Sequence, residues 1–121
     1  MTQRGIVLFG HGSRDPLWRK PIEAVAERVR ALDTAVDVRC AYLELTEPDL
    51  PATVERMMAE GIRAITIVPM FLGVGKHARE DLPLLLDVLR RQHPLAEFNL
   101  QASVGEQPAM IELLAKIALI I

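Results

Sequence analysis

Apolar residues follow two alternating patterns along the chain. Some segments are continuously apolar or apolar at every second residue, which is typical of β-strands; between them apolar residues recur every three or four positions, which is typical of amphipathic helices. Strands are predicted at residues 5–10, 36–45, 62–71 and 97–104. The first two helices are predicted at about 17–32 and 50–60.

The third and fourth helices are predicted from their first turns. Asp81 is an expected N-cap with Pro83 in the first turn behind it, and the fourth helix is expected to open near Pro108. The final run, residues 117–121, is almost wholly apolar. We expect that tail to be buried in the core of the chain itself or against a partner subunit.

The alternation of strands and helices indicates an α/β fold. Buried strands joined by amphipathic helices predict a parallel sheet with right-handed crossovers and helices on both faces. We expect a small doubly wound sheet of four strands in the order 2-1-3-4, with its switch point between the first and third strands. The chain of 121 residues fits a single domain spanning 1–121.

Composition narrows the possible functions. The net charge of -2 and the 4% aromatic content argue against a nucleic-acid binder. The single cysteine, Cys40, excludes an internal disulfide and lies in an apolar run, so a buried thiol is expected. The first apolar run is too short for a signal peptide or a membrane span, and a cytoplasmic protein with no membrane partner is expected.

Polar side chains follow three of the predicted strands. His11 comes after the first strand, Glu44 ends the second, and Lys76 and His77 follow the third. Because the carboxyl ends of parallel strands meet at one edge of a sheet, His11 and His77 are expected to face each other across the switch-point crevice. Imidazoles and a carboxylate suit a divalent metal ion or acid–base chemistry, although a histidine after a strand can also simply hydrogen-bond a loop.

The glycines and cations around these histidines can each have a functional or a purely structural role. Gly10 and Gly12 allow close approach of a bulky ligand or only permit a turn. The cations Arg14, Lys76 and Arg79 are placed to bind anionic groups or are merely solvated. The sequence lacks a G-x-S-x-G elbow, a G-x-G-x-x-G fingerprint and a P-loop, so nucleotide binding has no support beyond the fold.

Three motifs together resemble a known family. Three segments are similar to the sirohydrochlorin chelatases of the CbiX/SirB type, the class II chelatases: G-H-G-S-R-D-P after the first strand, Y-L-E-L-T-E-P at the end of the second and V-P-M-F-L-G-V-G-K-H-A-R-E-D-L-P after the third. The motifs occur in order over nearly the whole chain, and the length resembles the short form of that family.

The resemblance implies an enzyme that inserts Co²⁺, Fe²⁺ or Ni²⁺ into sirohydrochlorin, an anionic tetrapyrrole of the cobalamin and sirohaem routes, as a homodimer without any further cofactor. By motif position, His11 and His77 would bind the metal and accept protons, with Glu44 assisting. The substrate-binding residues that it implies are Gly12, Ser13, Arg14, Gly75, Lys76 and Arg79.

Two other functions remain open from the sequence. One is a non-catalytic metal or tetrapyrrole carrier that uses the same residues. The other is a flavodoxin-like regulatory or phosphate-binding domain, which the lack of a phosphate loop disfavours.

Overall fold

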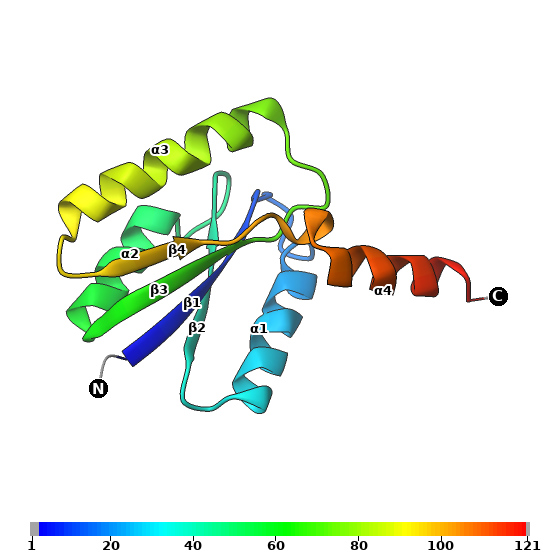
Figure 1. The fold of residues 1–121 in the computed structure, drawn as a ribbon, viewed down its shortest axis with the longest axis horizontal. Coiled ribbons are helices and arrows are strands. Elements are labelled where there is room, and N and C mark those ends of the chain that lie inside the picture. The colour runs from blue at the N-terminus through cyan, green and yellow to red at the C-terminus, as the bar shows by residue number, and fades with distance from the viewer. Residues whose placement is uncertain (1–2, 121) are drawn as a thin grey trace.

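A four-stranded parallel sheet forms the centre of the computed structural model, which describes residues 3–120 (Figure 1). The strand order is β2-β1-β3-β4, so the predicted order is confirmed. The strands are β1 (Gln3–Gly10), β2 (Asp37–Tyr42), β3 (Ile62–Pro69) and β4 (Glu97–Leu100). Because β1 pairs with both β2 and β3, the chain reverses its direction of travel across the sheet at β1, as a switch point requires.

Helices cover both faces of the sheet, as predicted. The helices are α1 (Lys20–Leu32), α2 (Leu50–Ala59), α3 (Lys76–Gln92) and α4 (Pro108–Ala118), and a short 3-10 turn, η1 (Val104–Glu106), precedes α4. Successive side chains of β1 point to opposite faces. Val7 and Phe9 pack with α2 and α3, whereas Leu8 packs with α1. No helix within residues 3–120 combines the length and apolar composition needed to cross a membrane.

Two helix starts follow their local sequence signals. The Asp49 carboxylate accepts a hydrogen bond from the Ala52 amide at 2.8 Å and caps α2. The first helix begins at Lys20 rather than near residue 17. Pro21 lacks an amide hydrogen, so it is best placed in a first turn and sets that start.

Three strand ends lie earlier than predicted. β2 ends at Tyr42, so Glu44 stands in the turn beyond the strand rather than at its end. There Leu45 takes a left-handed conformation with φ of 66°, which turns the chain out of the sheet. β3 ends at Pro69, which has no amide hydrogen to donate. β4 ends at Leu100, because its neighbour β3 extends little further.

The prediction for the start of the third helix is wrong. α3 begins at Lys76 with Gly75 as its N-cap, and Asp81 and Pro83 both lie inside it. Pro83 removes one hydrogen bond to the carbonyl of Arg79, but both residues are exposed, so water can satisfy that carbonyl. As a result Lys76, His77 and Arg79 lie in the first turn of a helix, not in a loop.

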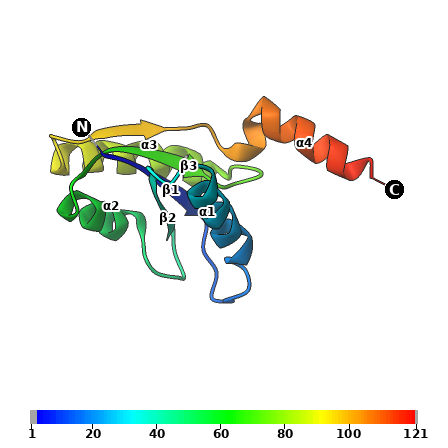
Figure 2. The same ribbon diagram turned by 90° about the horizontal axis from the view of Figure 1, so that it is seen from below.

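Two places were expected for the apolar tail, and the first of them, the core of its own chain, is wrong; burial against a partner subunit stays a prediction. In both views α4 extends away from the sheet (Figures 1 and 2). None of its residues is buried, and Leu119 and Ile120 beyond it are each 77% exposed. Ile121, the last residue of the predicted tail, lies outside the described residues.

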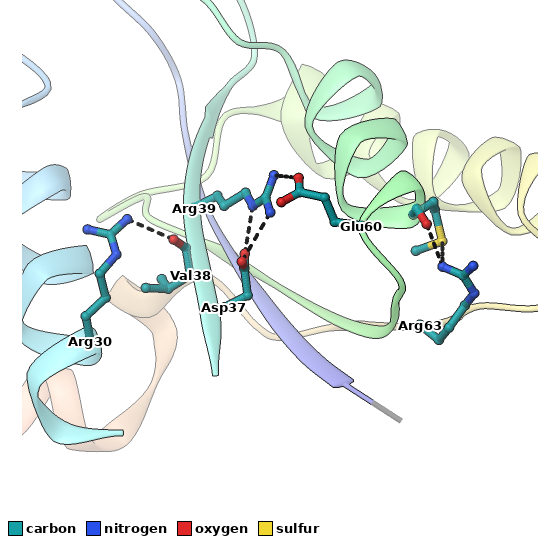
Figure 3. A network of polar contacts seen from close by, with 7 residues as sticks. Arg30, Asp37, Val38, Arg39, Glu60 and Arg63 are labelled. Atoms are coloured by element: carbon teal, nitrogen blue, oxygen red, sulfur yellow. Dashed lines mark hydrogen bonds and ion pairs between the residues drawn. The ribbon is translucent and has the colours of Figure 1, made fainter. Parts of the chain in front are cut away.

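Arginines fasten the helices to the amino ends of the strands (Figure 3). On β2, Arg39 pairs with Asp37 at 2.7 Å and with Glu60, just after α2, at 2.9 Å. These hydrogen bonds, that to Asp37 first, raise the pKa of the Arg39 guanidinium. Arg30 donates to the Val38 carbonyl at 2.9 Å and so joins α1 to β2. This edge of the sheet is therefore structural.

Replacing Leu86 by alanine tests the core on the α3 side. Leu86 is 1% exposed, so the L86A variant leaves a cavity and should lower the free energy of unfolding by about 2–5 kcal/mol in urea titrations. Leu84, on the same helix, is 62% exposed, and the matched L84A variant should change that free energy by about 0.5 kcal/mol or less. Equal losses in the two variants would contradict the packing described.

Candidate functional site

The loops that follow β1 and β2 lie side by side at the carboxyl edge of the sheet. The Leu43 amide donates to the Gly10 carbonyl at 2.9 Å, and the Glu44 amide donates to the His11 carbonyl at 3.1 Å. These bonds continue the pairing of the two strands for two residues beyond their ends. They bring His11 and Glu44 to adjacent positions.

Gly12 makes that approach possible. Its φ is +105°, in the region that side chains rarely adopt, and a Cβ atom at this position would lie 1.7 Å from the Glu44 carbonyl oxygen. No other residue fits here without moving the loop. The sequence left two roles open for Gly12, a turn in the chain or close approach of a ligand. The structure shows that the turn alone already requires glycine at this position.

The His11 imidazole and the Glu44 carboxylate form a pair. His11 Nε2 lies 3.1 Å from Glu44 Oε1, and both side chains are 55% exposed. A carboxylate only accepts hydrogen bonds, so Nε2 is the donor of this pair, and in the neutral ring Nδ1 keeps its lone pair. That ring can therefore bind a metal ion or accept a proton at Nδ1, while the carboxylate holds it in place.

Phe71 forms the apolar side of this pair, and sequence reasoning did not single it out. Its ring packs edge-on against His11, with centroids 6.4 Å apart, and against Phe9 at 6.1 Å. The Met70 amide donates to the Phe9 carbonyl at 2.7 Å, which fixes the start of the loop after β3. An aromatic residue at the end of the apolar run that precedes two glycines was the signal available in the sequence.

His77 stands apart from this pair. It lies in the first turn of α3 and is exposed, as are Lys76 and Arg79. Within residues 3–120 no hydrogen bond, ion pair or ring contact joins it to His11 or Glu44, and no group of three or more His, Cys, Asp or Glu side chains there is arranged to hold a metal ion. That His77 works together with His11 stays a prediction.

The other glycines near the candidate site, Gly10, Gly73 and Gly75, are of two kinds. A Cβ atom on Gly10 would meet Ile22 Cδ1 at 2.6 Å, so this glycine serves packing against α1. A Cβ atom on Gly73 or Gly75 would meet nothing within 4 Å, and neither residue has a positive φ. The backbone therefore does not require glycine at 73 or 75, and these positions leave open space beside the first turn of α3.

Ser13 and Arg14 complete the loop after β1. The Ser13 hydroxyl accepts from the Asp15 amide at 3.1 Å, and the Asp15 carboxylate accepts from the Leu17 amide at 2.9 Å. These bonds shape the turn toward α1. Arg14 is exposed, and its side chain forms no hydrogen bond or ion pair with residues 3–120, which leaves its charge available to a ligand at this edge of the sheet.

Two hollows border the site. One, of about 550 Å³, is open and is lined by Glu44 with its neighbours from 43 to 49, Ala52 and Arg56. The other, of about 200 Å³, lies between the loop after β2 and α3. Its lining residues are Phe9, Leu43, Ala78, Asp81, Leu82 and Leu85. The site is thus an open surface beside one apolar pocket. An open surface suits a large ligand better than a small ligand that must be enclosed.

Cys40 and Tyr42 add no reactive group near the site. Cys40 is half-buried rather than fully buried as expected, and burial raises the pKa of its thiol. Burial also raises the pKa of Tyr42 to about 12. At neutral pH both side chains stay protonated, so neither is a nucleophile or a base.

Comparison with known proteins identifies relatives over most of the chain. A family model described as CbiX matches residues 5–118. The "Sirohydrochlorin cobaltochelatase" of Methanococcus aeolicus is 37% identical over 84 residues, which are 69% of this chain and 59% of that protein. Across three such archaeal relatives the matched segment spans between 57% and 62% of their length.

Solved structures share the fold. A protein of Marinobacter aquaeolei VT8, described as a putative cobalamin biosynthesis CbiX protein, superposes with a TM-score of 0.82 at 30% identity over 95% of this chain and 93% of that one. The sirohydrochlorin chelatase SirB of Bacillus subtilis subspecies spizizenii, solved in complex with cobalt, superposes with a TM-score of 0.78 at 24% identity. This chain covers 49% of the SirB chain.

Replacing Gly12 by alanine tests the loop contact. The G12A variant places a side chain at a left-handed φ and against the Glu44 carbonyl, so we expect a loss of about 1–3 kcal/mol or more in the free energy of unfolding. Gly75→Ala is the matched control, because its Cβ meets open space. Urea titration of both variants checks this, and a G12A protein as stable as G75A would show that the two loops do not approach as described.

Proposed function

Because this chain belongs to the CbiX family, we propose that it is a chelatase that inserts a divalent metal ion into sirohydrochlorin. The metal is Co²⁺, Fe²⁺ or Ni²⁺ and is a substrate. The observation that carries the proposal is the exposed His11–Glu44 pair at the carboxyl edge, with Nε2 and Oε1 3.1 Å apart. The name of the Methanococcus relatives, sirohydrochlorin cobaltochelatase, supports the choice of substrate class.

His11 and His77 are the proposed metal-binding and proton-accepting residues. Insertion removes two protons from pyrrole nitrogens and replaces them by one divalent cation, so the enzyme needs acceptors for both protons. His11 presents Nδ1 for a metal ion or a proton, and the imidazolium formed by protonation gains an ion pair with Glu44. His77, exposed in the first turn of α3, is the proposed second acceptor.

Three cations are proposed to bind the carboxylates of the ring. Lys76 and Arg79 are exposed on one turn of α3, and Arg14 is exposed in the loop after β1. Ring carboxylates are anionic at neutral pH, and guanidinium or ammonium groups are their usual partners. Gly12, Ser13 and Gly75 are proposed to line the ring site, and the open space beside Gly75 suits a flat, wide ligand.

Further properties expected from the sequence are part of this proposal. The enzyme would act as a homodimer of single-domain chains, in the cytoplasm, with no cofactor beyond its metal substrate and no nucleic-acid partner. A non-catalytic carrier of metal or tetrapyrrole is the alternative function, since the same residues would bind either ligand without promoting insertion.

Replacing His11 by alanine tests the role of the pair. Loss of an acid–base group typically costs on the order of 10²–10⁴-fold in rate, so the H11A variant should insert Co²⁺ into sirohydrochlorin at least about 100-fold more slowly, followed by absorbance of the ring. The H77A variant should also be slowed. His93, at the far end of α3 and beside Phe98, is the control, and H93A should keep the wild-type rate.

The same assay separates the enzyme from the carrier. If wild-type protein inserts Co²⁺, Fe²⁺ and Ni²⁺ no faster than buffer while still binding the ring or the metal, the chelatase proposal is wrong and the carrier stands. If H11A inserts at the wild-type rate, the pair is not the reacting site, and the chelatase proposal itself is unaffected.

Removing the cations of α3 tests substrate binding. The double variant K76A/R79A should raise KM for sirohydrochlorin about tenfold or more with little change in kcat, because each lost charge-assisted hydrogen bond weakens binding by roughly 1.5–3 kcal/mol at most. Arg91 lies on the same helix near its other end and is exposed, so R91A serves as the control for the loss of a positive charge elsewhere on α3. A KM unchanged in K76A/R79A would place the ring elsewhere.

A further inference from the structure

The apolar pocket beside the candidate site has no part in the chemistry proposed so far. Its volume is about 200 Å³, and it is lined by Asp81 and five apolar residues. The apolar lining residues are Phe9, Leu43, Ala78, Leu82 and Leu85. Phe9 and Leu43 stand near the carboxyl ends of β1 and β2, whereas the other lining residues belong to α3. The pocket therefore lies between the loop that carries Glu44 and the helix that carries His77.

The pocket is adjacent to the His11 ring. The Phe9 ring, which lines the pocket, packs edge-on against Phe71 with centroids 6.1 Å apart, and His11 packs edge-on against the same Phe71 at 6.4 Å. Leu43 lines this pocket and also the larger hollow that contains Glu44. A large ligand in contact with the His11–Glu44 pair is therefore within reach of the pocket.

The other wall of the pocket is one face of the first turns of α3. Its side chains recur at the spacing of three and four residues that places them together on a helix, and they are Ala78, Asp81, Leu82 and Leu85. His77 directly precedes Ala78 and stands four residues before Asp81, so it borders this face. A group in the pocket would thus lie between the strand end that carries His11 and the helix turn that carries His77.

The size and polarity of the pocket indicate which part of a ligand it accepts. Cavities that enclose a whole drug-sized ligand measure about 300–1,000 Å³, so this pocket takes only a small part of a macrocycle. Its apolar walls offer no hydrogen-bond partner, and a polar group that leaves water without a partner costs free energy. The pocket therefore suits a small apolar group that projects from a large ligand.

Sirohydrochlorin, the proposed substrate, carries such groups. Each of its reduced pyrrole rings has a tetrahedral carbon with a methyl group on one side of the ring plane and a carboxymethyl group on the other. A methyl group that enters the pocket directs the carboxymethyl group of the same carbon away from it. Asp81 is exposed and opposes the reverse placement, because two carboxylates would then face each other.

We propose that this pocket receives a methyl group of sirohydrochlorin and thereby selects methylated tetrapyrroles from those that carry only carboxylate-bearing substituents. The inference rests on the proposed function and names the residues that determine its substrate specificity. Lys76 and Arg79, the proposed partners of the ring carboxylates, bind what all of these tetrapyrroles share. Ala78 and Leu43 contact the group that distinguishes sirohydrochlorin from them.

Equilibrium binding of metal-free rings tests the proposal. Uroporphyrin has the same kinds of carboxylate side chains as sirohydrochlorin but no methyl substituent. Fluorescence titration of the wild type should give a Kd for sirohydrochlorin about tenfold or more below that for uroporphyrin, which is the usual effect of one carbon atom in an apolar pocket.

Replacing Ala78 by leucine separates the pocket from other causes of that preference. Ala78 is half-buried beside the open volume, so the larger side chain fills the pocket without entering the packed core. The A78L variant should raise the Kd for sirohydrochlorin about tenfold and leave the Kd for uroporphyrin unchanged. Ala24→Leu makes the same change at an exposed position of α1 and should keep the wild-type preference. Circular dichroism should be the same for both variants and the wild type.

Three results would overturn the proposal. They are a wild type that binds both rings equally or binds neither, an A78L variant that keeps the preference, and an A78L variant that weakens the binding of both rings alike. The rings contain no metal, so these readouts do not depend on insertion. A preference that A78L abolishes, in a protein that inserts no metal, would refute the chelatase proposal and leave the methyl pocket standing. Insertion by a wild type whose preference A78L does not change would do the reverse.

Discussion

Gly12 passes so close to the Glu44 carbonyl that no side chain fits between them, and the candidate site depends on this approach. The contact extends the pairing of β1 and β2 past the ends of the strands, which places the His11 ring beside the Glu44 carboxylate. Because backbone atoms set the distance, the pair is held at 3.1 Å although both side chains are more than half exposed. A flexible surface pair would lose that geometry to side-chain entropy.

Charged side chains are paired at one edge of the sheet and unpaired at the other. At the amino ends of the strands, Arg39 and Arg30 have hydrogen-bond partners and fasten α1 and α2 to the sheet. At the carboxyl ends, Arg14, Lys76 and Arg79 are exposed and form no ion pairs within residues 3–120. Charges that are paired hold a fold together, whereas charges left free at a crevice are available to a ligand. Because parallel strands all run in the same direction, their amino ends and their carboxyl ends lie at opposite edges of the sheet, and the paired and unpaired arginines and lysines lie at these different edges.

Most of the fold could be predicted from the sequence because apolar periodicity and strand polarity act locally. The strand order, the covered faces and the placement of His11 and Glu44 at one edge all follow from those two rules. The start of α3 could not be predicted from the sequence. Pro83 is tolerated inside this helix because water can reach the carbonyl of Arg79, and the exposure of that carbonyl is a property of the tertiary structure. The role of Phe71 also depends on a contact between distant segments.

By itself the His11–Glu44 pair would bind a metal ion more weakly than a structural site does, which is consistent with the proposed use of the metal as a substrate. Structural zinc sites close the ion within four protein ligands and release it rarely. A chelatase must bind the ion, shed part of its water and then surrender it to four ring nitrogens, so strong ligation by the protein would oppose the reaction. Glu44 hydrogen-bonds His11 through Nε2 and leaves only Nδ1 of that ring for the ion. In the proposed chelatase, the pair would thus give a bound state from which the metal can still leave.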